Sequence, residues 1–111
     1  MLLDQAGAEG TPENISFQRL WLEARAQLLA ARGETMEAAR LAREAVEILA
    51  ATDQINAHAN ALVDLADILR ADGDEDGSAA AFEQALELYE EKGNLLGADR
   101  VRGALASGRV S

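Results

Sequence analysis

One stretch of the chain recurs forty residues later, and this recurrence restricts the fold more than any other feature. When residues 24–53 are shifted by forty positions onto residues 64–93, Gly33 coincides with Gly73. Small and apolar residues recur at the same offset in the pairs Ala26/Ala66, Leu29/Leu69, Ala31/Ala71, Ala39/Ala79 and Ala45/Ala85. A fixed period that contains two helical segments is the signature of an α-solenoid, in which similar helical hairpins stack on one another.

Apolar residues in and around these two units follow the three- and four-residue steps of amphipathic helices. The pattern predicts five helices: residues 12–32, residues 35–51, a third from residue 55 to Asp72-Gly73, a fourth that ends at Lys92-Gly93, and a fifth from Asn94 that fades near Ser107-Gly108. Thr11, Pro12 and Glu13 form a typical helix start. Because the connections are short, neighbouring helices must pack antiparallel.

We therefore expect an all-α protein, an α-solenoid of two helix-turn-helix hairpins plus a C-terminal capping helix. Residues 11–111 are expected to form this single domain. Residues 1–10 contain two glycines and little periodicity, so they form either a disordered lead or the frayed end of a further helix.

The composition excludes several classes of function. The chain has 20 acidic residues against 10 lysines and arginines, a net charge of −10. A surface of this sign repels phosphate groups, so we expect no binding to nucleic acid or to anionic membranes. The chain has no cysteine, which excludes disulfides and cysteine-based zinc sites. It also lacks a basic N-terminal region and any long apolar run, so we expect a cytoplasmic protein without a signal peptide or membrane span.

The second unit resembles the tetratricopeptide repeat. The residues that match that family's helix A, turn and helix B are Leu62, Leu65, Ala66, Leu69, Gly73, Asp74, Phe82, Ala85, Leu86 and Leu88, and the first unit matches at Leu22, Ala26, Leu29, Gly33, Ala38 and Ala45. Arg25, Ala42 and Ser78 depart from the family's preferences, and the period exceeds the family's usual length of about 34 residues. This longer period is similar to the variant found beside ATPase modules in bacterial signal-transduction and transcriptional regulators.

The resemblance implies a right-handed superhelix that recognises a peptide or a partner domain, without catalysis and without a cofactor, in a larger bacterial regulator. It also implies which residues line the binding groove of helix A. These are Leu20, Glu23, Gln27 and Ala30 in the first unit, and Asn60, Val63, Asp67 and Arg70 in the second. Because Glu23 and Asp67 are acidic, we expect a polar or basic partner segment. The alternative interpretation is that these residues form a solvated surface.

The turn between the two helices of the second unit carries a motif that suggests another function. Asp72, Asp74, Asp76 and Glu83 stand at the spacing of calcium ligands in an EF-hand loop. The repeat, however, predicts a helix from about residue 75, where an EF-hand needs an irregular loop. We therefore predict no metal site, with a calcium-binding module through residues 72–83 as the weaker alternative.

The ends of the solenoid suggest a third function. Apolar faces expected on the first and fifth helices predict self-association, so the chain is alternatively a structural helical unit that forms a homodimer. Trp21 either anchors a partner or covers the first helix, and His58 is expected on a helix surface. Arg100 and Arg102 either pair with the acidic fourth helix or form a basic patch. No residues stand in the pattern of a nucleophile with its base, so we predict no enzyme.

Overall fold

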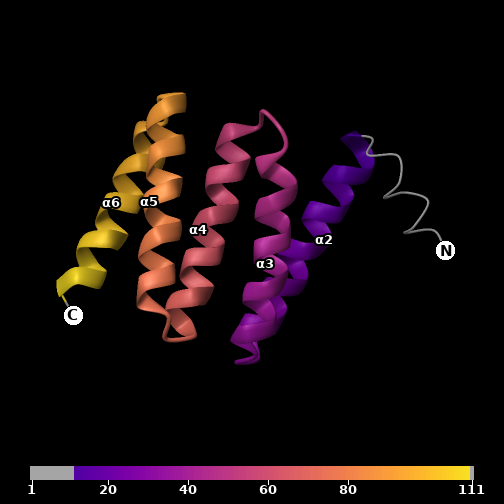
Figure 1. The fold of residues 1–111 in the computed structure, drawn as a ribbon, viewed down its shortest axis with the longest axis horizontal. Helices are drawn as coiled ribbons and strands as arrows, with labels where there is room; N and C mark the ends of the chain where they lie inside the picture. Colours follow the sequence, from indigo (N-terminus) through magenta and orange to yellow (C-terminus); the bar gives the residue numbers. More distant parts are fainter. Residues whose placement is uncertain (1–11, 111) are drawn as a thin grey trace.

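The computed structural model describes residues 12–110, with side chains from Phe17 to Ser107, and this part of the chain is entirely helices and turns. The elements are α2 (Pro12–Ala31), α3 (Thr35–Ala50), α4 (Ile55–Ala71), α5 (Glu75–Lys92) and α6 (Leu95–Val110). They stand side by side as antiparallel neighbours (Figure 1). The predicted all-α fold is confirmed, and residues 1–10, expected to be a lead segment, lie outside the described residues.

Three of the four turns have the same backbone geometry. Gly33, Gly73 and Gly93 have φ values of +85°, +90° and +80°, in the left-handed region that favours glycine. In each turn the next residue donates its backbone N–H to a carbonyl five positions earlier: Glu34 to Leu29 at 2.9 Å, Asp74 to Leu69 at 2.9 Å and Asn94 to Tyr89 at 2.8 Å. The shared bond pattern explains why glycine recurs at the helix ends.

The turn between α3 and α4 has no glycine and is closed by a side chain instead. The hydroxyl of Thr52 donates to the carbonyl oxygen of Leu49 at 2.7 Å and accepts from the backbone N–H of Gln54 at 3.2 Å. Each helix packs along the next one in the chain, and α2 also contacts α4. The result is a slab with principal extents of 48 × 34 × 17 Å.

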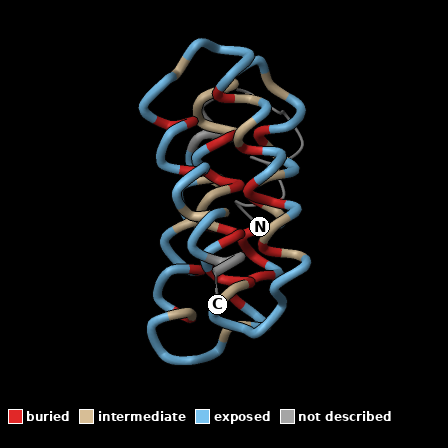
Figure 2. The backbone as a smooth tube through the Cα atoms, turned by 90° about the vertical axis from the view of Figure 1, so that its left-hand side faces the viewer, coloured by how far each residue is buried: buried red, intermediate tan, exposed pale blue. Residues whose placement is uncertain are grey.

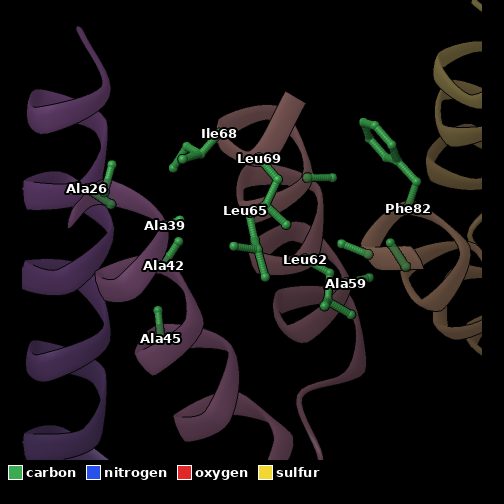
Figure 3. Close-up of a cluster of buried hydrophobic side chains, with 14 of the residues drawn as sticks. Ala26, Ala39, Ala42, Ala45, Ala59, Leu62, Leu65, Ile68, Leu69 and Phe82 are labelled. Carbon is green, nitrogen blue, oxygen red and sulfur yellow. The ribbon is translucent and has the colours of Figure 1, made fainter. Parts of the chain in front are cut away.

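The core lies between the helices, along the middle of the slab (Figure 2). The alanines expected to let the helices approach, Ala26, Ala45, Ala66 and Ala85, are all buried. In Figure 3 the side chain of Ile68 on α4 points toward Ala39 and Ala42 on α3, so a large residue fills the space that small residues leave. Phe82 and Tyr89 of α5 are buried as well and fill the second half of the core.

Two residues and one helix end differ from the preferences or expectations given by the sequence. Ser78 stands where the tetratricopeptide family prefers alanine; it is buried, and its hydroxyl donates to the carbonyl oxygen of Ala66 at 2.8 Å. His58, expected on a helix surface, is half-buried, and burial lowers its pKa. The fifth helix, expected to fade near Ser107, continues to Val110 because Ala98 and Val101 hold it against α5.

Candidate functional site

The predicted groove residues lie on α2 and α4, but they differ in how open they are. Leu20, Gln27, Asn60 and Asp67 are exposed, whereas Glu23, Ala30, Val63 and Arg70 are half-buried. The four exposed residues form two pairs related by the forty-residue shift, Leu20 with Asn60 and Gln27 with Asp67. The same face of α2 and of α4 is therefore exposed.

Three carboxylates gather on this face, and we call Glu23, Asp64 and Asp67 the acidic patch. Burial, followed by the negative charges of Glu23 and Asp67, raises the pKa of the Asp64 carboxyl to about 6. Burial also raises the pKa of Asp67. Glu23 and Asp67 thus both come close enough to repel Asp64, although Glu23 stands on a different helix from the other two. A cation that entered the patch would relieve this repulsion.

Asp64 is the member of the acidic patch that the sequence did not predict. Its repeat partner is Ala24, and this position is not among the helix A positions that the family resemblance assigns to the groove. With Glu23 it lines a small crevice over Ala26, Ala42, Ala45, Ala61 and Ile68. The crevice has a volume of about 10 Å³, which is room for one water molecule. Because the alanines that line it are small, water can reach the carboxylate of Asp64 there.

Two arginines lie at the edges of the acidic patch. The guanidinium of Arg19 pairs with the carboxylate of Glu23 at 3.2 Å, one helical turn away on α2. Arg100, on α6, is near enough to lower the pKa of both Asp64 and Asp67. Its Nη2 donates to the hydroxyl of Tyr89 at 3.3 Å, and that hydroxyl donates to Oδ1 of Asn60. Arg100 is the repeat partner of Asn60, and this relation could have placed it on the groove from the sequence alone.

The side chains of Val63 and Arg70 mainly contact other parts of the protein rather than solvent. Val63 packs against the core. The guanidinium of Arg70 lies 5.1 Å from the centroid of the Phe82 ring, and its Nη2 donates to the carbonyl oxygen of Ala104 at 3.0 Å. Arg70, which lies on α4, therefore contacts both α5 and α6.

A second hollow lies on the opposite side of α4, between α3 and α5. It has a volume of about 260 Å³, with Leu62, Leu65 and Leu69 at its floor and Arg43, Glu47 and Gln84 among its lining residues. Sequence analysis did not predict it, because the hollow depends on the spacing between α3 and α5. Its apolar floor carries no charged group, so it differs in chemistry from the acidic patch.

The acidic turn at residues 72–83 does not form an EF-hand loop. Helix α5 begins at Glu75, so most of the segment is regular helix. The carboxylate of Asp74 caps this helix, accepting the backbone N–H of Gly77 at 2.9 Å, and Asp72 accepts the hydroxyl of Thr35 at 2.6 Å. Within the described residues, no group of three or more acidic or histidine side chains has a metal-binding arrangement. The helix from Glu75 thus occupies most of the segment that an EF-hand would need as an irregular loop.

Arg102 links α6 to α5. Arg102 forms ion pairs with Glu90 of α5 and with Asp99 of its own helix. This confirms that one of the two arginines pairs with the acidic helix that the sequence predicts as the fourth, which is α5.

None of the helices described combines the length and the apolar character that crossing a membrane requires.

Comparison with known proteins identifies the family. The model of the soluble NSF attachment protein family, SNAP, matches residues 13–107, which include nearly all of the five helices. No curated protein and no solved structure matches the chain significantly. The match confirms the helical-repeat class that the sequence pattern predicts, but not the bacterial long-period variant in particular. The chain belongs to the soluble NSF attachment protein family, a family of helical protein-interaction adaptors.

Proposed function

We propose that the chain is a non-catalytic adaptor that binds a basic segment of a protein partner on the groove face formed by α2, α4 and α6. The observation that carries the proposal is the convergence of Glu23 with Asp64 and Asp67 from two different helices. Membership of an adaptor family supports a protein partner in general, and the acidic patch supports a basic one.

The groove offers a lysine or arginine side chain two favourable changes. The incoming cation reduces the repulsion among three carboxylates, and it meets charges that are already partly removed from water. Around the patch, the exposed amides of Gln27 and Asn60 can hydrogen-bond to a peptide backbone. Leu20, which is 55% exposed, adds an apolar contact beside these polar groups.

The binding test compares a short lysine-rich peptide with its glutamate counterpart by isothermal titration calorimetry. We expect the lysine peptide to bind and the glutamate peptide not to bind. Replacing all three members of the acidic patch, Glu23→Gln, Asp64→Asn and Asp67→Asn, should weaken the lysine peptide by about tenfold or more. Three partly screened charge contacts of about 0.5 kcal/mol each amount to roughly the 1.4 kcal/mol that corresponds to tenfold.

A matched triple variant controls for net charge. Glu75→Gln, Glu87→Gln and Glu91→Gln remove three exposed carboxylates from α5, outside the groove. If both triple variants weaken binding equally, the peptide responds to the overall charge of −10 and the acidic patch is not the site. Binding of the glutamate peptide would contradict the proposal directly.

A further inference from the structure

The outer face of α2 carries an exposed apolar stripe. Phe17 is 61% exposed, Trp21 53% and Leu28 43%. With the exposed Ala24 and Ala31 they follow steps of four, three, four and three residues, and we call these five residues the α2 stripe. This alternation is the spacing by which one helix forms a seam with another. Leu20, 55% exposed, lies beside the stripe.

The repeat shows what this stripe corresponds to inside the molecule. A shift of forty residues places Trp21 on Ala61 and Leu28 on Ile68. Both equivalents are buried, and they line the same crevice as Ala26, Ala42 and Ala45 of the preceding unit. At the positions of Trp21 and Leu28, the α2 stripe therefore matches a surface through which a unit of this solenoid packs against its neighbour, and on α2 both side chains are about half-exposed.

The other end of the solenoid has a different character. The positions of α6 that correspond to the buried Ala59 and Leu62 of α4 are Asp99 and Arg102, and both are exposed. Arg102 pairs with Asp99 at 3.0 Å and with Glu90 of α5. An apolar helix docked on this face would have to break these ion pairs and bury their charges, so stacking of copies in a head-to-tail row is unfavourable. Of the two apolar ends predicted from the sequence, only the α2 end has a continuous apolar face; on α6 the exposed Leu95 and Leu96 are confined to its first turn.

We propose that two copies of this chain associate through the α2 stripe about a two-fold axis. A two-fold contact sets the same apolar stripe against itself and closes at a dimer, so it does not involve the polar α6 end. The two rings lie at the N-terminal end of the stripe and the alanines lie farther along it, so in a two-fold antiparallel contact Ala24 and Ala31 leave space for the rings of Phe17 and Trp21 of the other copy. These two half-exposed rings alone leave on the order of 200 Å² of apolar surface uncovered. Together with Leu20 and Leu28 they form a contiguous patch of the kind that marks an interaction surface.

The test uses sedimentation equilibrium and the fluorescence of Trp21, the chain's one tryptophan. We expect a concentration-dependent rise from the 11.8 kDa monomer to twice that mass. Over the same concentration range the emission of Trp21 should shift to shorter wavelength, because the indole leaves water at the interface. A chain that stays monomeric over the whole range would overturn the proposal, and the stripe would then be left for a helix of another protein or of a further repeat unit.

A pair of charge variants separates the α2 stripe from other exposed apolar residues. Phe17→Glu retains Trp21 as the reporter and should weaken the dimer by at least about tenfold, with loss of the concentration-dependent emission shift. Leu96→Glu changes a leucine that is 85% exposed at the start of α6, and it should leave the dimer intact. Because both residues are exposed, both variants should keep the helical circular dichroism of the parent chain. A dimer that survives Phe17→Glu and is broken by Leu96→Glu would assign the interface to α6 and refute the proposal.

Discussion

Asp64 carries a negative charge in surroundings that disfavour it. The carboxyl is partly buried, and Glu23 and Asp67 add repulsion, while Arg100 offsets only part of these effects. Such a group costs native-state stability whenever it is ionised. A half-buried carboxylate that reduces stability is a candidate for binding, because a partner can supply a counter-charge.

Replacing Asp64 with asparagine should stabilise the protein at neutral pH. The pKa is about 6 in the folded chain and near 3.8 when unfolded, so the native state binds the proton more tightly. The wild-type protein therefore loses stability through this group as the pH rises from about 4 to about 6, and the loss is complete above 6. After allowance for solvent screening, we expect Asp64→Asn to gain on the order of 1 kcal/mol at pH 7 and almost nothing at pH 4.

Urea unfolding of both proteins at the two pH values measures this difference, and taking the difference removes the contribution of His58. Glu87→Gln, a neutralisation at an exposed site on α5, is the control and should change stability little at either pH. A gain for Asp64→Asn that is equal at pH 4 and pH 7 would show that the charge of Asp64 is not the cause.

The same residue shows how far the sequence could predict the candidate site. Glu23 and Asp67 follow from helix periodicity and family position, because each occupies a helix A groove position. The approach of Asp64 to Glu23 depends on how closely α2 and α4 pack, and the small side chains of Ala26 and Ala61 decide that distance. Such a contact between helices is not encoded in the pattern of either helix alone, so the acidic patch became visible only in three dimensions.

At the scale of elements, the turns explain most of what the sequence did predict. The glycines at 33, 73 and 93 require the left-handed region, so the sequence marks three helix ends within a residue or two. The acidic turn was ambiguous, because one aspartate suits both a calcium loop and a helix cap. Asp74 became a cap since the core residues Ala81, Phe82 and Ala85 hold α5 in helix from its first turn.

The turn glycines give a prediction with an internal control. Gly73 has a φ of +90° and nothing within 4 Å of an added Cβ, so Gly73→Ala tests backbone conformation without a clash. We expect a loss of about 1 kcal/mol, from the cost of placing a side chain in the left-handed region less the gain from a stiffer unfolded chain. Gly103 also has nothing within 4 Å but lies inside α6, so Gly103→Ala should gain about 0.5–1 kcal/mol.

Thermal unfolding of the two variants and of the parent chain tests both the predicted loss and the predicted gain of stability. The same added methyl group should lower the melting temperature at position 73 and raise it at position 103. If both variants shift the melting temperature in the same direction, the left-handed turn is not a determinant of stability in this chain.

At the scale of the whole molecule, the helices form a row in which most contacts join sequence neighbours. Stability in such an arrangement is close to a sum of unit and interface contributions, so different parts of the row can open separately. Helix α4 contacts helices on both of its sides, whereas α6 contacts mainly α5 and is also held by the bond from Arg70 to Ala104. We therefore expect amide hydrogen exchange to be slowest in α4 and faster in α6.

Val101→Ala tests this separation of the row into units. Val101 is 1% exposed and packs in the core that joins α6 to the other helices, so its truncation should cost about 2 kcal/mol. If α6 opens as a local unit, that cost should appear as roughly thirtyfold faster exchange in α6 and leave the amides of α2 and α3 nearly unchanged. Ala39→Gly in α3 is the matched variant from the first unit, and it should accelerate exchange in α2 and α3 rather than in α6. A uniform acceleration across all five helices in either variant would show instead that the described part of the chain unfolds as one cooperative body, in which the interface between units is as strong as the units themselves.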